Sequence, residues 1–86
     1  MRVRENNFMP ENIPIIFSRH ALIKLQQRGL TKEMVIRTIE HPAHFMLVRG
    51  QMHAFRKFGA LYLKVVFART ENSVMVITEH LVRKLP

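Results

Sequence analysis

The stretch from residue 17 to residue 31, FSRHALIKLQQRGLT, places a histidine beside two cations. On a helix His20 shares a stripe with Lys24, four residues later, and Arg28 lies beside that stripe. The positive end of the helix dipole and the lysine both disfavour a charged imidazolium, so we expect a neutral ring. A neutral imidazole could accept a proton near neutral pH while the cations attract phosphate. The alternative is a solvated basic face without chemistry.

Other residues could take part in phosphate chemistry of this kind, and the family resemblance given below implies a specific reaction, the cleavage of RNA without a metal ion. This reaction needs a base for the 2′-hydroxyl, cations for the charged phosphorus intermediate and an acid for the leaving oxygen. We assign His20 as the base and His80 or Tyr62 as the acid. The candidate phosphate contacts are Lys24, Arg28, Arg56 and Lys64. The alternative for Arg56, Lys64 and Tyr62 is a solvated sheet face, and for His80 a structural histidine.

Other site types find little support in the sequence. The chain has five histidines, but Pro42 interrupts the HPAH segment, residues 41–44, and no carboxylates accompany it at ligand spacing. Glycine-rich phosphate loops and nucleophile motifs are absent from the sequence. We therefore predict no metal site and no cofactor.

The charge of the chain suggests a partner. Lys and Arg number 14 against 6 Asp and Glu, which gives a net charge of +8 on 86 residues. Such an excess favours a polyanionic partner, namely RNA, DNA or an acidic protein. The alternative is a small basic protein whose charge only keeps it soluble.

Length and composition predict one small folded domain. Residues of the hydrophobic set make up 48% of the chain, which is typical of a globular protein. The lack of cysteine fits a reducing compartment, so we expect a cytoplasmic protein. The longest apolar runs, residues 65–68 and 74–77, are too short for a membrane helix, and no signal peptide is recognised.

Two consecutive helices are predicted from their end signals. Ser18 is a good N-cap for the first helix, and Gly29 supplies its left-handed stop. Thr31 caps the second helix, which should end at His41 because Pro42 disfavours helix in the residue before it. On the first helix Ala21, Leu22 and Leu25 share one side and should face the core.

The rest of the chain alternates with a period of two. Residues 43–48, 52–58, 61–69 and 73–82 are predicted strands with short connections, and residues 14–17 form a further short candidate strand. We therefore expect an α+β domain over residues 15–86, with two consecutive helices packed on one face of an antiparallel sheet of about four strands. Residues 1–14 read as a polar N-terminal tail. The last strand is apolar on both faces and should lie inside the sheet.

The segment HALIKLQQRGLT, followed by the second helix, an HP dipeptide and strands ending in VMVIT, resembles a widespread prokaryotic domain family of unknown function. That family is similar to the BrnT toxins and more distantly to the RelE and ParE toxin superfamily. The resemblance covers about residues 15–80 and rests on His20, Ala21, Arg28, Gly29 and Thr31. Lys24 stands where the family pattern has arginine, which keeps the charge but loses a bidentate phosphate contact.

This resemblance implies a compact RelE/BrnT-like fold and an endoribonuclease activity restrained by an acidic antitoxin protein. A domain of the same fold that only binds RNA or an acidic protein is the alternative function. An exposed strand edge could also pair with an antitoxin segment or with a second copy of the chain, giving a homodimer.

Overall fold

The computed structural model describes residues 13–86, so only the last two residues of the expected tail, residues 1–14, are seen. The elements are β1 (Ile15–Phe17), α1 (Arg19–Gln27), α2 (Lys32–Glu40), β2 (His44–Val48), β3 (Gln51–Phe58), β4 (Leu61–Arg69) and β5 (Val74–Val82). The predicted α+β class and both helices are confirmed. Within the described part of the chain, neither helix has the length and apolar character required to cross a membrane.

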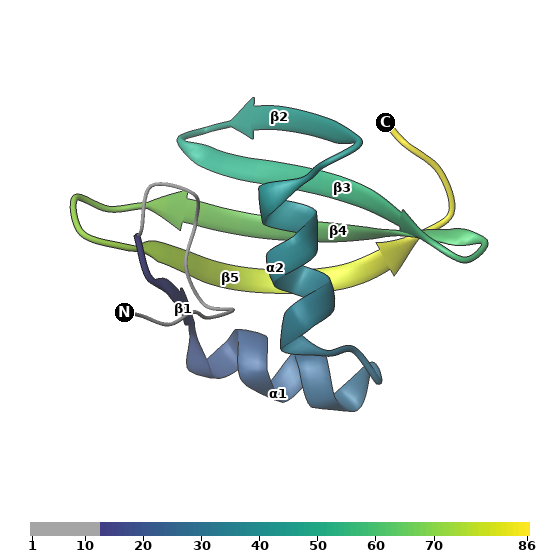
Figure 1. Ribbon diagram of the computed structural model, residues 1–86, viewed down its shortest axis with the longest axis horizontal. Coiled ribbons are helices and arrows are strands. Elements are labelled where there is room, and N and C mark those ends of the chain that lie inside the picture. The colour runs from purple at the N-terminus through teal and green to yellow at the C-terminus, as the bar shows by residue number, and fades with distance from the viewer. Residues whose placement is uncertain (1–12) are drawn as a thin grey trace, which may run out of the picture.

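The strands form one sheet in the order β1-β5-β4-β3-β2 (Figure 1). Strands β2 to β5 are antiparallel neighbours, but β1 pairs with β5 in parallel, with Ile15 opposite Val74. The prediction of an antiparallel sheet of about four strands is therefore wrong: the sheet is mixed and has five strands. The error arose because β1 is only three residues long and pairs with the strand farthest from it in sequence. The two helices carry the chain from β1 at one edge of the sheet to β2 at the other, and the meander then brings β5 back beside β1.

Two short turns fix the register of the meander. Arg49 and Gly50 join β2 to β3 with φ angles of 52° and 80°, the signs of a type I′ turn, and Val48 lies opposite Gln51. Another two-residue turn joins β3 to β4, where Phe58 lies opposite Leu61. Because side chains alternate along a strand, these turns determine which side chains share a face of the sheet.

The hydrophobic core lies on the face of the sheet that α2 crosses (Figure 1). Its buried residues come from α2, from β3 to β5, from the β1–α1 segment and from Leu30 between the two helices. The helix contributes Val35, Ile36 and Ile39, while β4 contributes Leu63, Val65 and Phe67. We refer to this side of the sheet as the covered face.

The first helix lies along the edge of the sheet beside β5 (Figure 1). Ala21 is fully buried, whereas Leu22, which we expected in the core, is exposed. The buried side of α1 is therefore narrower than the apolar side predicted from its sequence.

Polar side chains at both ends of α1 attach it to β5. β1 ends at Phe17, so beyond Val76 none of the described strands pairs with β5 on that side. The Ser18 N–H donates to the Val76 carbonyl at 3.0 Å, and its hydroxyl donates to the Ile77 carbonyl at 3.2 Å. At the other end, Nη1 of Arg28 donates to the Glu79 carbonyl at 2.7 Å. The helix thus satisfies carbonyl groups that another strand would otherwise bind.

We predict that Ser18→Ala destabilises the protein by about 1–2 kcal/mol, measured by urea unfolding. The hydroxyl caps α1 by accepting from the Ala21 N–H at 3.0 Å and also binds β5. The matched control is Thr31→Ala, because Thr31 caps α2 by accepting from the Met34 N–H but makes no bond to the sheet. Equal losses in the two variants would contradict the role of Ser18 in holding α1 on β5.

Candidate functional site

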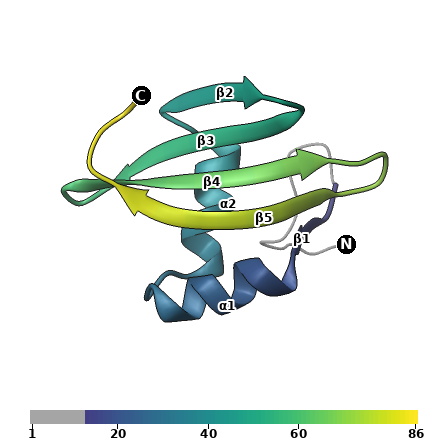
Figure 2. The same cartoon turned by 180° about the vertical axis from the view of Figure 1, so that it is seen from behind.

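The face of the sheet opposite α2 carries most of the chemistry. We call it the open face, because within residues 13–86 no helix lies over it (Figure 2). The strand registers place on it the side chains of His44, Met46, His53, Phe55, Lys57, Tyr62, Lys64, Val66, Thr78 and His80. Histidine, lysine and aromatic residues therefore share one surface made by four strands.

Four of these side chains form a central row across the strands. His80 lies opposite Lys64, Lys64 opposite Phe55, and Phe55 opposite His44. The Lys64 Nζ lies 5.9 Å from the centroid of the Phe55 ring, and the His44 ring centroid lies 5.7 Å from it on the other side. Phe55 is only 4% exposed. It therefore acts as a support for the lysine rather than as a free surface for stacking on a base.

The β3–β4 turn explains why lysines meet aromatic rings on this face. A two-residue turn makes Phe58 and Leu61 a hydrogen-bonded pair, so Phe55–Lys64 and Lys57–Tyr62 are both non-hydrogen-bonded pairs. Side chains lie closest in such pairs. Consistent with this, the Lys57 Nζ lies 5.9 Å from the centroid of the Tyr62 ring.

Two histidines of the open face are shifted toward the neutral form. Burial, and then the charges of Lys64 and Arg28, lower the pKa of His80 below its ordinary value. Burial, followed by the charge of Lys64, lowers the pKa of His53. Both imidazoles are therefore mainly neutral at pH 7, and Lys64 influences both of them. A neutral imidazole beside an ammonium group can accept a proton next to a bound anion.

Arg28 stands at the border of this site. It caps the end of α1, its side chain is exposed, and one of its five N–H donors binds the Glu79 carbonyl. That bond holds its guanidinium at the β5 edge, near enough to His80 to lower the pKa of the ring. Of the candidates from the sequence, Arg28, Lys64 and His80 are therefore brought together, and Tyr62 lies two residues from Lys64 on the same face.

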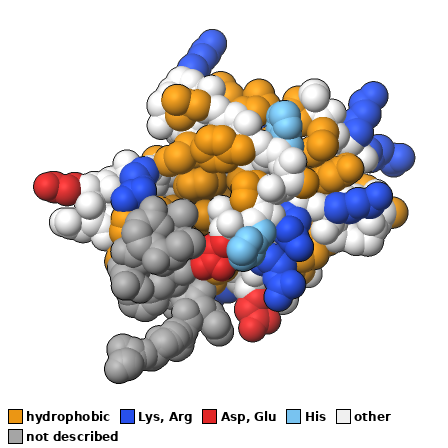
Figure 3. All heavy atoms as spheres, turned by 45° about the horizontal axis from the view of Figure 1, so that its top comes forward, with side chains coloured by type: hydrophobic (Ala, Val, Ile, Leu, Met, Phe, Trp, Pro, Cys, Tyr) orange, Lys and Arg blue, Asp and Glu red, His pale blue; other side chains and the backbone are white. Residues whose placement is uncertain are grey.

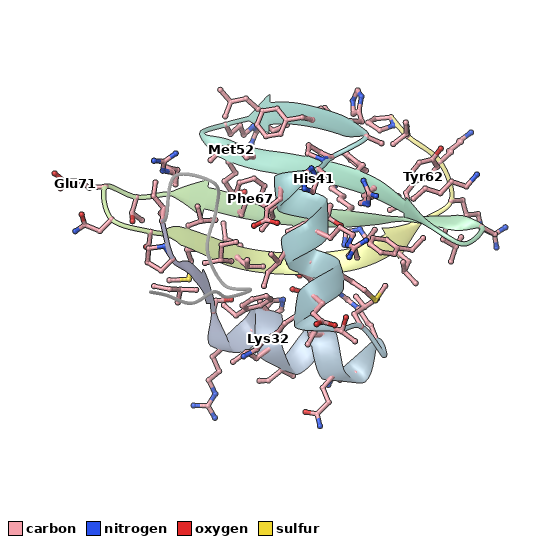
Figure 4. The ribbon with its side chains drawn as sticks, in the orientation of Figure 1. Lys32, His41, Met52, Tyr62, Phe67 and Glu71 are labelled. Atoms are coloured by element: carbon pink, nitrogen blue, oxygen red, sulfur yellow. The ribbon has the colours of Figure 1, made fainter. Side chains whose placement is uncertain are left out.

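The remaining candidates lie elsewhere. His20 is exposed on α1, eight residues before Arg28, which is about 12 Å along a helix axis. Lys24 is half-buried on the same helix. Arg56 points to the covered face, since it lies opposite Leu63, and its Nη1 donates to the His41 carbonyl at the end of α2 at 2.7 Å. His41 is labelled in Figure 4. The structure therefore does not join His20 or Arg56 to the central row.

The sequence hypothesis missed His53 and His44 and gave Lys57 no role. The sequence did contain a signal for these residues, because a two-residue turn fixes the register of the strands that it joins. Counting outward from the pair Phe58–Leu61 places Phe55 opposite Lys64. The same count places His53 opposite Val66. Alternation then assigns His53 and Lys64 to one face.

A buried acid lies next to His80 in sequence but on the opposite face. Glu79 is 0% exposed and lies opposite Val65 of the core. Among residues 13–86, neither of its carboxylate oxygens finds a hydrogen-bond partner. Burial raises its pKa to about 7, although the nearby Arg28 charge opposes the rise. Near neutral pH this acid is therefore substantially uncharged and only partly offsets the cations.

Over the described range, no three His, Cys, Asp or Glu side chains are grouped so that they could hold a metal ion. Comparisons of the chain with protein-family models, curated proteins and solved structures give no match.

We predict that Glu79→Gln changes the pH dependence of stability. The raised pKa means that folded Glu79 binds its proton more tightly than the unfolded chain does. Its contribution is therefore most favourable below about pH 4.5 and is lost as the pH rises to about 7, a change of about 3 kcal/mol. The difference in unfolding free energy between wild type and Glu79→Gln should grow by this amount across that range, with the variant favoured at the higher pH.

The matched control is Glu71→Gln, because Glu71 is exposed in the turn between β4 and β5 (Figure 4). This variant makes the same exchange of a carboxylate for an amide at an exposed position outside the core. If the difference between wild type and Glu79→Gln did not vary with pH, the raised pKa assigned to this buried acid would be contradicted.

Proposed function

We propose that the protein binds RNA on the open face of its sheet and cleaves it without a metal ion, as a small cytoplasmic ribonuclease of the RelE/BrnT toxin type. The observation that supports this most directly is the pairing of His80 with Lys64, a neutral imidazole opposite a cation on an uncovered sheet face. The net charge of +8 supports a polyanionic substrate.

The proposed reaction assigns one role to each group. The His80 imidazole accepts the proton of a 2′-hydroxyl, whose oxygen attacks the adjacent phosphorus. Lys64 and the free donors of Arg28 stabilise the negative charge on the phosphate oxygens. The bond to the 5′-oxygen breaks, and that oxygen takes a proton from the Tyr62 hydroxyl. The products are a 2′,3′-cyclic phosphate and a 5′-hydroxyl, and transfer of a proton from His80 to Tyr62 through solvent restores both groups.

This assignment moves the base from His20 to His80. His20 lies about 12 Å along α1 from Arg28, whereas a base must come within hydrogen-bond distance of the proton that it takes. His20 and Lys24 would then serve at most as outer contacts for the RNA backbone.

A second candidate function is RNA binding without cleavage. Two of the phosphate contacts predicted from the sequence, Arg28 and Arg56, donate to main-chain carbonyls, which reduces the donors left for a transition state. Electrostatic binding through Lys57, Lys64 and the exposed chain end at Arg83 and Lys84 does not require those donors. In either case an acidic antitoxin protein is the proposed protein partner.

Cleavage is tested by incubating the purified chain with RNA in EDTA and analysing the fragments for 2′,3′-cyclic phosphate ends. We predict that His80→Ala and Lys64→Ala each lower the rate by about 100-fold or more. His20→Ala, the matched histidine control, should keep the rate. Arg37→Ala, on the exposed side of α2, controls for the loss of one positive charge.

The pH dependence separates chemistry from folding. The rate should rise with pH through a value below the ordinary histidine pKa, because His80 must be neutral. A Lys64→Arg variant should keep the apparent pKa of the rate low, because the positive charge beside His80 remains. In the residual activity of Lys64→Ala the apparent pKa should be higher, because that charge is lost. RNA binding without cyclic phosphate ends would support the second candidate, and equal cleavage by wild type and His80→Ala would reveal a contaminating nuclease.

A further inference from the structure

The outer strand of the sheet, β2, leaves one edge unpaired. Val48 and Gln51 flank a two-residue turn and so form a hydrogen-bonded pair. Since such pairs alternate along an antiparallel ladder, His44 and Met46 also direct their backbone groups toward β3. The N–H and C=O groups of Phe45 and Leu47 therefore point out of the sheet and have no strand partner among the described elements.

This edge is also apolar. Phe45 and Leu47 are 52% and 69% exposed, and both lie on the covered face at the margin of the sheet. Figure 3, which brings the β2 side forward, shows hydrophobic side chains gathered over β2 and β3. The strand sequence HFMLV contains no proline and none of the lysine or carboxylate side chains that usually protect a sheet edge.

We propose that two copies of the chain pair through β2 in antiparallel orientation, centred on Met46, to form one continuous sheet of both subunits. The backbone geometry supports a second copy as the partner of this edge. The outward N–H and C=O groups of Phe45 and Leu47 lie symmetrically on either side of Met46, so each residue of one copy can exchange both bonds with the other residue of the second copy. Phe45 of each copy then lies opposite Leu47 of the other, in a hydrogen-bonded pair. The strand itself carries no Lys, Arg, Asp or Glu, so the pairing puts no like charges directly opposite each other despite the net charge of +8.

The dimer would also join the two open faces. Residues directly opposite in a sheet share a face, so Met46 of one copy meets Met46 of the other on that side. The two central rows then belong to one surface, with His44 as the member of each row nearest the junction. This pairing does not require RNA cleavage.

The dimer is tested by measuring mass with light scattering over a range of protein concentrations. The wild type should shift from monomer to dimer as the concentration rises. Leu47→Pro should stay monomeric with an unchanged circular dichroism spectrum, because the Leu47 N–H points outward and its loss removes no bond to β3. The matched control is Ile23→Lys, which adds a charge at an exposed apolar residue of α1 and should leave the dimer intact.

A mixing experiment tests the register and does not depend on the proline variant. Phe45→Glu and Leu47→Lys should each be monomeric alone, and their mixture should restore a dimer with one copy of each, since the new charges lie opposite each other. The proposal would be overturned if the wild type stayed monomeric at every concentration. A monomeric wild type whose β2 edge pairs only with an acidic peptide would overturn it as well. So would a dimer that survives both charged variants, or one that Ile23→Lys dissolves.

Discussion

The structure depends on how the backbone carbonyl groups in the second half of β5 find hydrogen-bond donors. β1 pairs with β5 only as far as Val76, and beyond that point the carbonyls need donors from another source. The first helix supplies them from Ser18 at its start and Arg28 near its end. This requirement holds α1 beside the sheet edge and fixes the Arg28 guanidinium near His80, on the border of the open face.

A β-bulge divides β5 into segments with different alternation. The register shifts between Val66 and Phe67, so Val76 and Glu79 both lie on the covered face although their numbers differ in parity. As a result Glu79 is buried and His80 turns to the open face beside Lys64. Burial disfavours charge on both side chains, which raises the pKa of the acid and lowers that of the base. Two adjacent residues are thus both shifted toward neutrality, for the same physical reason.

Lys64 connects the electrostatics of the open face to its packing. Its ammonium lies over the Phe55 ring, its charge lowers the pKa of His80 and His53, and its strand lies between those of the two histidines. Phe55 is covered on both sides by Lys64 and His44, so an aromatic residue can be buried on a face over which no helix of residues 13–86 lies. The open face is therefore an ordered surface with one central cation, and the proposed RNA chemistry follows from that arrangement.

The sequence by itself determined the local features: the caps Ser18 and Thr31, the stop at Gly29, and the positions of the main strands. These depend on residues close together in the chain, and the two-residue connection at residues 59–60 would even have given the register of β3 and β4. Only the tertiary structure decided that β1 joins β5 in parallel, that Arg28 and Arg56 bind carbonyls, and that Arg28, at the opposite end of α1 from His20, is the α1 residue held beside His80. The bonds from Ser18 and Arg28 to β5 span 59 and 51 residues. Such contacts depend on how the whole chain closes, which no local period or spacing specifies.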